Sequence, residues 1–355
     1  MANKIARLGD LATYINGYAF KPADWGDTGL PIIRIQDLTG NSYQLNRYDG
    51  EYPERIEVND GDVLISWSAS LGVYVWQRGK ALLNQHIFKV VFDKLPVNKE
   101  YFVFAVEHKL AEMESKTHGA TMKHIVKKDF DGTTIPYPPI EKQAEIADHL
   151  RRITSLIDKQ TEQLLLLDQL VKSRFIELFG DPVINPKGFP CYTVGEVIDF
   201  QGGSQPDKKY FEYEASPDNI RLIQIRDYKS DKYITYIPKT MAKRFCTADD
   251  IMIGRYGPPI FQILKGIEGS FNVALMKATP KIGNREFVRQ FLKQDCLLEY
   301  LEGLSKRTAG QDGIQMDKLK AYPFPYPPIE LQEQFASFVE QTDKSKLCGR
   351  MEVAA

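Results

Sequence analysis

The sequence predicts an α+β chain with two tandem mixed α/β domains, joined by a long coiled-coil helix and followed by a shorter, antiparallel C-terminal helix. Three observations support this fold class. A set of short motifs occurs twice along the 355 residues. Each copy carries short apolar runs bounded by Gly, Asp, Asn and Pro, a pattern typical of strands. An apolar stripe with a period of three to four residues follows the first copy.

The internal repeat is clearest in a proline-rich motif. Residues 136–143 read PYPPIEKQ, and residues 325–332 read PYPPIELQ, 189 positions later. Upstream, GDVLI at 61–65 corresponds to DDIMI at 249–253. Because the same order of motifs occurs in both halves, the chain is a tandem duplication whose copies we expect to be related by a pseudo-two-fold axis.

Each copy is expected to form one mixed domain, the first over residues 1–135 and the second over residues 182–326. Apolar residues that alternate or run continuously predict strands, and a longer periodic pattern near the end of each copy predicts a helix. The expected strands are 30–35, 63–67, 87–92, 222–225 and 251–253, and the expected helices are 99–114 and 285–304.

Residues 136–181 are predicted to be mainly one long helix. Pro138 and Pro139 suit its start, where a missing N–H costs nothing, and Glu141 is favourable near the positive end of the helix dipole. The chain then runs to Phe179 without Gly or Pro. Ten positions from Ile146 to Leu178 are spaced by four and three residues in turn, as in a coiled-coil seam. Gln160 and Arg174 are the two polar members, and the eight apolar ones are Ile146, Leu150, Ile153, Ile157, Leu164, Leu167, Val171 and Leu178.

At about 1.5 Å per residue such a helix is roughly 60 Å long. The alternative is a surface helix packed on one domain, but such a helix does not need a strict 3.5-residue period over this length. The second copy should send its own helix, residues 327–347, back along the first. Phe335 and Val339 keep the register of its seam, and residues 348–355 form a tail.

The second helix is expected to end near Lys346, at about half the length of the first. The seam from Leu164 to Leu178 would then lack a partner within its own chain. We therefore expect either self-association through this uncovered seam or a weaker hold on one partner subunit.

Composition excludes several classes of protein. The 46 basic and 47 acidic residues give a net charge of -1, and the hydrophobic content is that of an ordinary globular chain. The sequence contains no apolar run of about 18 residues and no signal-peptide pattern, so we expect a cytoplasmic protein. The four cysteines stand singly, which argues against a disulfide scaffold and against a zinc site.

The familiar catalytic motifs are absent from the sequence. It contains no phosphate-binding GK[ST] loop, no GxSxG, no HExxH and no methyltransferase-type Pro-Pro-aromatic motif. One near miss is Asp227 with Lys229, which resembles the loose pattern of a metal-dependent nuclease. The first copy keeps Asp37 but lacks the lysine, so the simpler interpretation is that Asp37 and Asp227 close equivalent strands. We predict no enzymatic activity and no metal site.

Basic and amide side chains gather at equivalent places in the two copies. One cluster precedes the first proline-rich motif and another precedes the second. Such side chains suit phosphates and base edges, although a solvated charged face is the alternative for any single cluster. The candidate DNA-binding residues from these and the other basic and aromatic clusters are Lys123, His124, Lys127, Lys128, Lys208, Lys209, Arg255, Tyr256, Lys306, Arg307, Gln311 and Gln315.

These motifs resemble the DNA-specificity subunits of type I restriction-modification systems. The resemblance covers about residues 5–346 and includes the two PPIExQ helices, the end of the central helix (FIELFGDP, 175–182) and GDVLISWSASLG at 61–72. Each motif alone is weak, and the constellation is specific. Within the last stretch, Trp67, Ser68 and Ser70 join the candidate DNA-binding residues.

The resemblance implies a subunit without a cofactor of its own. Each domain would recognise one half of a bipartite duplex DNA target, and the helices would set the spacer and dock two methyltransferase subunits. Those partners would methylate adenine with S-adenosylmethionine, and restriction subunits would add ATP- and Mg-dependent activity. A helical-rod adaptor that binds only protein, and a specificity subunit of a related restriction class, are the alternatives.

Overall fold

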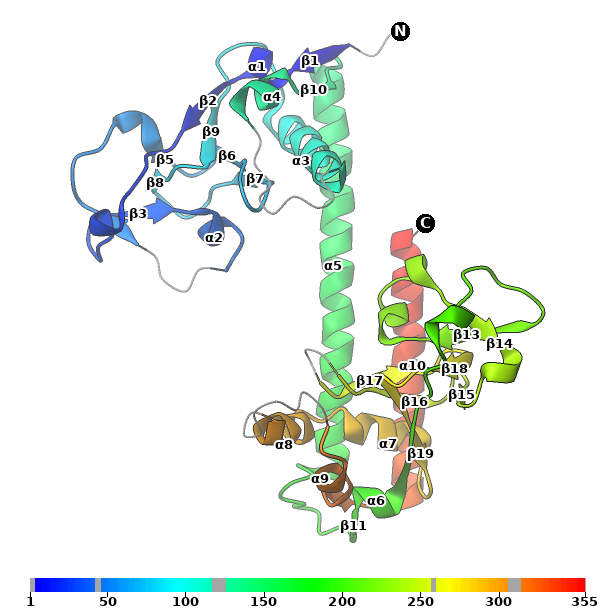
Figure 1. Cartoon of the computed structure of the whole chain (residues 1–355). Helices are drawn as coiled ribbons and strands as arrows, with labels where there is room; N and C mark the ends of the chain where they lie inside the picture. Colours follow the sequence, from blue (N-terminus) through cyan, green and yellow to red (C-terminus); the bar gives the residue numbers. More distant parts are fainter. Residues whose placement is uncertain (1–3, 42–45, 117–125, 257–259, 306–313, 355) are drawn as a thin grey trace. The chain divides into compact units, whose positions relative to one another are not determined.

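Each half of the chain is built from two four-stranded sheets, one two-stranded sheet and a few helices (Figure 1). The chain divides into two units, Met1–Ile157 and Asp158–Ala355, and each unit has its own hydrophobic cores. The computed structural model describes residues 4–41, 46–116, 126–256, 260–305 and 314–354.

The first unit contains the strands and helices of the first repeat and the beginning of the long helix. In chain order they are β1 (Ile5–Arg7), α1 (Leu8–Leu11), β2 (Thr13–Asn16), η1 (Pro22–Asp24), β3 (Leu30–Ile33), α2 (Ile35–Leu38), β4 (Arg47–Tyr48), η2 (Glu54–Ile56), β5 (Glu57–Val58), β6 (Val63–Ser66), β7 (Gly72–Val75), β8 (Ala81–Leu83), β9 (Ile87–Val91), α3 (Lys99–Lys116), α4 (Lys127–Gly132), β10 (Thr134–Pro136) and α5 (Ile140–Phe179).

The second unit contains the end of α5 and the elements of the second repeat. They are β11 (Cys191–Thr193), α6 (Val194–Val197), β12 (Ile198–Gly202), η3 (Lys208–Tyr210), β13 (Asn219–Ile223), η4 (Ile225–Tyr228), η5 (Asp231–Tyr233), β14 (Tyr236–Pro238), η6 (Lys239–Met241), β15 (Phe245–Cys246), β16 (Ile251–Gly254), β17 (Gln262–Lys265), β18 (Gly269–Phe271), β19 (Leu275–Pro280), α7 (Arg285–Leu292), α8 (Asp295–Ser305), α9 (Met316–Lys320), β20 (Pro323–Pro325) and α10 (Ile329–Ala354).

The sheets of the two units have the same topology. The first unit has strand orders β2-β9-β6-β7, β4-β3-β8-β5 and β1-β10, and the second has β12-β19-β16-β17, β14-β13-β18-β15 and β11-β20. In each unit one pair is parallel, β3 with β8 and β13 with β18. The duplication predicted from short motifs, and the α+β fold class, are therefore confirmed.

Most of the predicted strands and helices are present, with three corrections. The expected strand 222–225 begins earlier, at Asn219, and ends at Ile223, because Asp227 caps the helical turn that begins at Ile225. The expected strand 30–35 ends at Ile33, because Asp37 caps a helical turn that begins at Ile35. The expected helix 285–304 is two helices, α7 and α8. The N–H groups of Lys293 and Gln294 donate to carbonyl groups three residues earlier, which ends α7 and turns the apolar side chains of α8 toward the same core.

The two long helices are antiparallel where they meet in the second unit. The Phe335 ring of α10 lies 5.6 Å from the Phe175 ring and 5.3 Å from the Phe179 ring of α5. Farther along α10, the Lys346 ammonium lies 2.6 Å from the Asp168 carboxylate. As α10 advances toward its C-terminus, its partners on α5 therefore move toward the N-terminus, as predicted.

The predicted end of the second helix was wrong. Helix α10 continues to Ala354 rather than ending near Lys346. A single glycine within a helix costs only about 1 kcal/mol relative to alanine, so Gly349 does not end it. Helix α10 has 26 residues and α5 has 40, so the C-terminal helix is still the shorter.

The prediction that the seam from Leu164 to Leu178 lacks a partner within the chain was also wrong. Val171 is buried together with Phe335 and Val339 of α10, and Leu164, Leu167 and Leu178 are partly buried. The side chains of Ile146 and Leu150 are partly buried as well, whereas Ile153 and Ile157 are exposed. The exposed part of the predicted seam therefore lies in the first half of α5.

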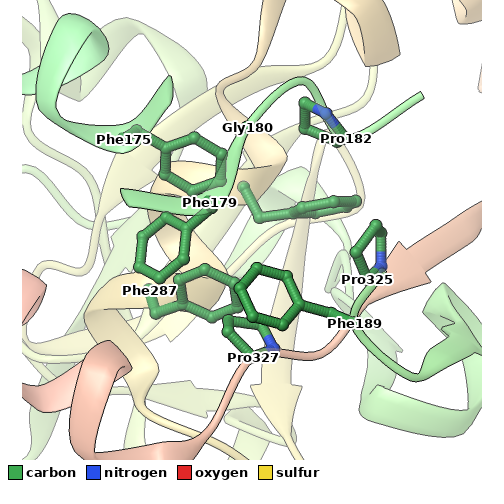
Figure 2. Close-up of a pocket in the computed structure, with 9 residues that line it drawn as sticks. Phe175, Phe179, Gly180, Pro182, Phe189, Phe287, Pro325 and Pro327 are labelled. Atoms are coloured by element: carbon green, nitrogen blue, oxygen red, sulfur yellow. The ribbon is translucent and has the colours of Figure 1, made fainter. Parts of the chain in front are cut away.

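Aromatic side chains fill the junction of α5, α7 and α10. Phe175, Phe179 and Phe287 pack on one another, and Phe335 packs on the first two, with ring centroids of these pairs 4.7–5.7 Å apart. Figure 2 shows the first three beside Phe189 and several prolines around a cavity of about 10 Å³. A cavity of that size holds about one water molecule, and its apolar lining offers no polar partner, so it is a packing gap rather than a ligand site.

Candidate nucleic-acid interface

Four segments of the first unit meet around the loop between β8 and β9. The N–H group of Asn84 donates to Ile33 at the end of β3 (3.2 Å), and the N–H group of Trp67 donates to His86 (3.3 Å). Tyr18, just after β2, donates to Leu83 (2.8 Å). We call residues 17–18, 33–34, 67–71 and 84–86 the first loop junction.

The same junction recurs in the second unit. Asn272 donates to Ile223 (3.0 Å), Arg255 donates to Ala274 (2.9 Å), and Ser204 donates to Phe271 (3.1 Å), all from backbone N–H groups. Residues 203–204, 223–224, 255–256, 260–261 and 272–274 form the second loop junction. Trp67 and Arg255, which the sequence suggested as DNA-binding residues, therefore occupy equivalent backbone positions.

A glycine permits the closest approach of two segments in each junction. A Cβ atom at Gly17 would lie 2.0 Å from the carbonyl oxygen of Asn84, and one at Gly203 would lie 1.9 Å from that of Asn272. Both distances are far inside van der Waals contact, so a side chain at either position would push the β2 or β12 segment away from its loop.

The junctions also hold unusual backbone conformations. Among the described residues, four residues other than glycine have positive φ, and three of them lie in the junctions: Ala69 (58°), His86 (73°) and Phe261 (61°). Such conformations cost free energy, so they persist only where the surrounding structure holds them. They are concentrated at functional sites.

Aromatic and basic side chains of the first unit meet at the Phe88 ring. Trp67 stacks on Phe88 with centroids 5.4 Å apart and planes at 21°, and the Trp67 and His86 rings are 5.1 Å apart. The Lys127 ammonium lies 5.5 Å from the centre of Phe88 and 3.1 Å from Asp131. Trp67 and Lys127 thus share the Phe88 ring as a neighbour, and Lys127 also pairs within its own helix.

The second junction presents a cation beside an exposed aromatic ring. The Arg255 guanidinium lies 5.3 Å from the centre of the Tyr256 ring, and its Nη1 lies 3.5 Å from the carbonyl oxygen of Val273. The Tyr256 side chain is about half exposed. An arginine held over a ring keeps its planar donor fork available for a phosphate or a guanine edge.

The other candidate residues lie at several places. Ser68 is half-buried and Ser70 is exposed in the first junction, and Lys128 is exposed on α4. Lys208 and Lys209 are exposed on η3, where Lys209 lies 5.0 Å from the centre of the Tyr210 ring. Gln315 immediately precedes α9. Five candidates lie outside the described residues: Lys123, His124, Lys306, Arg307 and Gln311.

Sequence reasoning missed two pairs of cationic and aromatic side chains. The Arg34 guanidinium lies 5.5 Å from the centre of the Trp25 ring, and the Arg226 guanidinium lies 5.9 Å from that of Tyr233. Arg34 immediately precedes the helical turn α2 that follows β3, and Arg226 lies within the turn η4 that follows β13. The repeated IRIQD and IQIRD motifs at 33–37 and 223–227 mark these turns and could have identified them.

Two acidic side chains cap these turns. Asp37 accepts a hydrogen bond from the N–H group of Arg34 (2.8 Å), and Asp227 accepts one from that of Gln224 (3.1 Å). Burial raises the pKa of the Asp227 carboxyl, despite its hydrogen bond to Gln224 and the neighbouring Arg221. Their positions support the structural interpretation of these acids rather than the nuclease one.

Two kinds of feature are absent from the part of the chain that the structure describes. Those residues contain no group of three or more His, Cys, Asp or Glu side chains arranged to hold a metal ion. Among the described helices, none combines the length and the apolar character needed to cross a membrane.

Comparison with known proteins identifies the repeats. A family model described as the type I restriction modification DNA specificity domain matches residues 3–167 and again residues 186–348. The EcoBI specificity subunit of a type I restriction enzyme from Escherichia coli is 29% identical, over 94% of this chain and 78% of its own length. The MjaVIII specificity subunit from Methanocaldococcus jannaschii is 24% identical, over 96% and 86%.

Solved structures agree with this fold. The S subunit of a type I restriction-modification system from M. genitalium superposes with a TM-score of 0.56 at 15% identity, covering 99% of this chain and 92% of that one. The family model matches well over half of the sequence, once in each repeat. The chain therefore belongs to the type I restriction-modification DNA specificity family, with one specificity domain in each unit.

Proposed function

We propose that the chain reads a bipartite duplex DNA target through its two loop junctions, one half-site to each unit. The observation that carries the proposal is that one backbone arrangement recurs in both units with different side chains on it. Trp67 and Arg255 make the same backbone hydrogen bond, yet one presents an indole and the other a guanidinium. Equivalent backbone arrangements that carry unlike side chains suit the recognition of two unlike half-sites.

The partners follow from the family. We infer that two methyltransferase subunits, and restriction subunits in the full complex, assemble on this chain and carry out the chemistry. In this proposal S-adenosylmethionine, ATP and Mg belong to those partners, and this chain supplies recognition without catalysis. Exposed apolar side chains on α5, such as Ile153 and Leu156, support a docking role for that helix because they present apolar surface to solvent.

The near-neutral charge suggests how DNA is held. A chain of net charge -1 has little excess positive charge for phosphates, so the partner subunits should supply many of the phosphate contacts. Each phosphate contact adds about 0.9 to the slope of log affinity against log salt concentration. The assembled complex should therefore bind its target more tightly, and with a steeper salt slope, than the isolated chain.

Electrophoretic mobility shifts at several salt concentrations test this proposal, with a randomised duplex pool as competitor. A sequence-specific shift in the presence of the methyltransferase partner separates a DNA reader from an adaptor that binds only protein. Equal affinity and equal salt slope for the isolated chain and the complex would contradict the proposal that the partner subunits supply many of the phosphate contacts.

A further inference from the structure

A fully buried glutamine stands near the start of each long helix. Gln143 of α5 and Gln332 of α10 have no exposed surface, and each follows the second proline of its PPIExQ motif by four positions. A buried amide must find partners for both its oxygen and its nitrogen, or its burial is costly. The hydrogen-bond partners of these two amides therefore show which segments each glutamine joins.

In the first unit, Gln143 joins the start of α5 to the start of α3. Its Oε1 accepts a hydrogen bond from the N–H group of Asn98 (2.9 Å), and its Nε2 donates to the carbonyl oxygen of Pro138 (2.8 Å). The Asn98 side chain in turn accepts from the N–H group of Tyr101, in the first turn of α3 (2.9 Å). One amide thus fixes the first turns of two helices together.

The second unit repeats these contacts. Gln332 Oε1 accepts from the N–H group of Asn284 (2.8 Å), and its Nε2 donates to Pro327 (2.8 Å). Asn284 caps α7 by accepting from Glu286 and Phe287. The agreement between the repeats shows that the glutamine of the motif joins each long helix to the start of an earlier helix in its own unit, α3 for α5 and α7 for α10.

The surroundings of the two glutamines differ. In the first unit, hydroxyl groups add two more hydrogen bonds across the same joint, from Tyr101 to Pro136 (2.8 Å) and from Tyr137 to Pro96 (2.6 Å). The second unit has Phe287 where the first has Tyr101, and Phe287 packs on the ring cluster of α5 and α10. The first joint thus depends on hydrogen bonds, whereas an apolar cluster supports the second.

We propose that Gln143 is a positioning residue that fixes the orientation of the rest of the first unit relative to the start of α5, and so sets which spacer length between half-sites the protein accepts. This inference rests on the proposed bipartite reading. Gln332 makes the same bonds, but its unit contains the end of α5 and all of α10, and the aromatic cluster holds those helices without it. Loss of Gln143 should therefore weaken the preference for one spacer length, and loss of Gln332 should leave that preference unchanged.

The test uses the full chain assembled with its methyltransferase partner and the variants Gln143→Met and Gln332→Met. Methionine has similar length and flexibility but cannot make either hydrogen bond. Binding is measured to duplexes that keep both half-sites and change the spacer by one or two base pairs. We expect Gln143→Met to reduce the preference for the native spacer by about fivefold or more, and Gln332→Met to change it by less than about twofold.

A milder matched pair keeps the test decisive if Gln143→Met does not fold. Tyr137→Phe removes the hydroxyl bond to Pro96, and Tyr326→Phe changes the equivalent residue of the second unit. We expect a smaller relaxation of the spacer from Tyr137→Phe and none from Tyr326→Phe, with unchanged midpoints of thermal unfolding for both.

An unchanged spacer preference in the Gln143 and Tyr137 variants would overturn the inference. Equal relaxation by the first-unit and second-unit variants, or altered base preference within a half-site, would also overturn it. If the unmodified complex itself selects no bipartite target, it is the proposed function that fails, and the two failures are thereby distinguished.

Discussion

Single residues on an equivalent backbone give the two units their different chemistry. The Trp67 indole stacks on Phe88 beside His86, whereas Arg255 holds a guanidinium over Tyr256. A guanidinium can donate two hydrogen bonds to the major-groove edge of guanine, and an indole cannot. In the proposed reading, the choice of residue at this one position therefore gives the two loop junctions different base preferences.

Arg255→Ala should weaken binding by about 1–3 kcal/mol and relax base preference within one half-site only, because the side chain belongs to the second junction. Competition between duplexes altered one base pair at a time, with the assembled complex, measures this effect. Trp67→Leu is the matched variant and should alter the other half-site. Relaxation of both half-sites by Arg255→Ala would contradict the assignment.

Predictability at this scale depended on residue type and repetition. Trp67 became a candidate through a stretch that resembles the specificity family, and Arg255 through its place beside Tyr256; their equivalence became visible only in the structure. The place of His86 in the first loop junction could not be predicted. Its positive φ results from the packing of the β8–β9 loop and leaves no mark in the sequence. The Arg34 and Trp25 pair was missed because tertiary structure brings the two side chains together.

Helix α5 has two parts with different surroundings. Val171, Phe175 and Phe179 are spaced by four residues and are buried beside α10, whereas Ile153 and Leu156 are exposed. A straight helix has 3.6 residues per turn, so its buried face drifts away from a strict 3.5-residue stripe. The seam predicted from the stripe therefore missed Phe175 and Phe179 and included Ile153.

Replacing a buried and an exposed side chain of this helix should separate folding from docking. Phe175→Ala removes a ring that is 1% exposed and should lower the free energy of unfolding of the second unit by about 3–5 kcal/mol. Ile153→Ala, at a side chain that is 53% exposed, should leave stability nearly unchanged and weaken co-purification with the methyltransferase subunit. Thermal unfolding and co-purification of both variants provide the measurements.

These assignments would be contradicted if Ile153→Ala destabilised the chain as much as Phe175→Ala. Full partner binding by Ile153→Ala would contradict the docking assignment, and normal stability of Phe175→Ala would contradict the packing assignment.

The Asp343 carboxylate of α10 forms ion pairs with three basic side chains around it. The Asp343 carboxylate lies 2.7 Å from Lys265, 3.5 Å from Lys346 and 3.8 Å from Arg289. Burial alone would raise its pKa, but the hydrogen bond from Lys265 and the other cations outweigh burial, and the pKa is lowered from 3.8. Asp343 therefore stabilises the fold as an anion.

The sign of this shift predicts a pH dependence. Because the folded pKa lies below the unfolded one, the stabilisation is present above about pH 4 and is lost as the pH falls through the folded pKa. Between about pH 5 and pH 3, the unmodified chain should lose more stability than the Asp343→Asn variant does. Parallel curves of unfolding midpoint against pH for the two proteins would show that Asp343 does not contribute this dependence.

At the scale of the whole chain, duplication is the dominant feature. The same order of short motifs in both halves was enough to predict it. The proline-rich motif recurs with a structural role: its Pro-Pro pair precedes each long helix, and its final glutamine bonds to the first proline of that pair. The lengths of α7 and α10 could not be predicted. Breaks and ends of helices depend on tertiary packing and on small differences in free energy, such as the cost of one glycine.

Selection of bound duplexes from a fully randomised pool, by the chain assembled with its methyltransferase partner, tests the central claim most directly. The account predicts two short, unlike half-sites separated by a spacer of fixed length and arbitrary sequence, with Arg255→Ala altering only one of them. A single uninterrupted motif, or binding without any sequence preference, would contradict it.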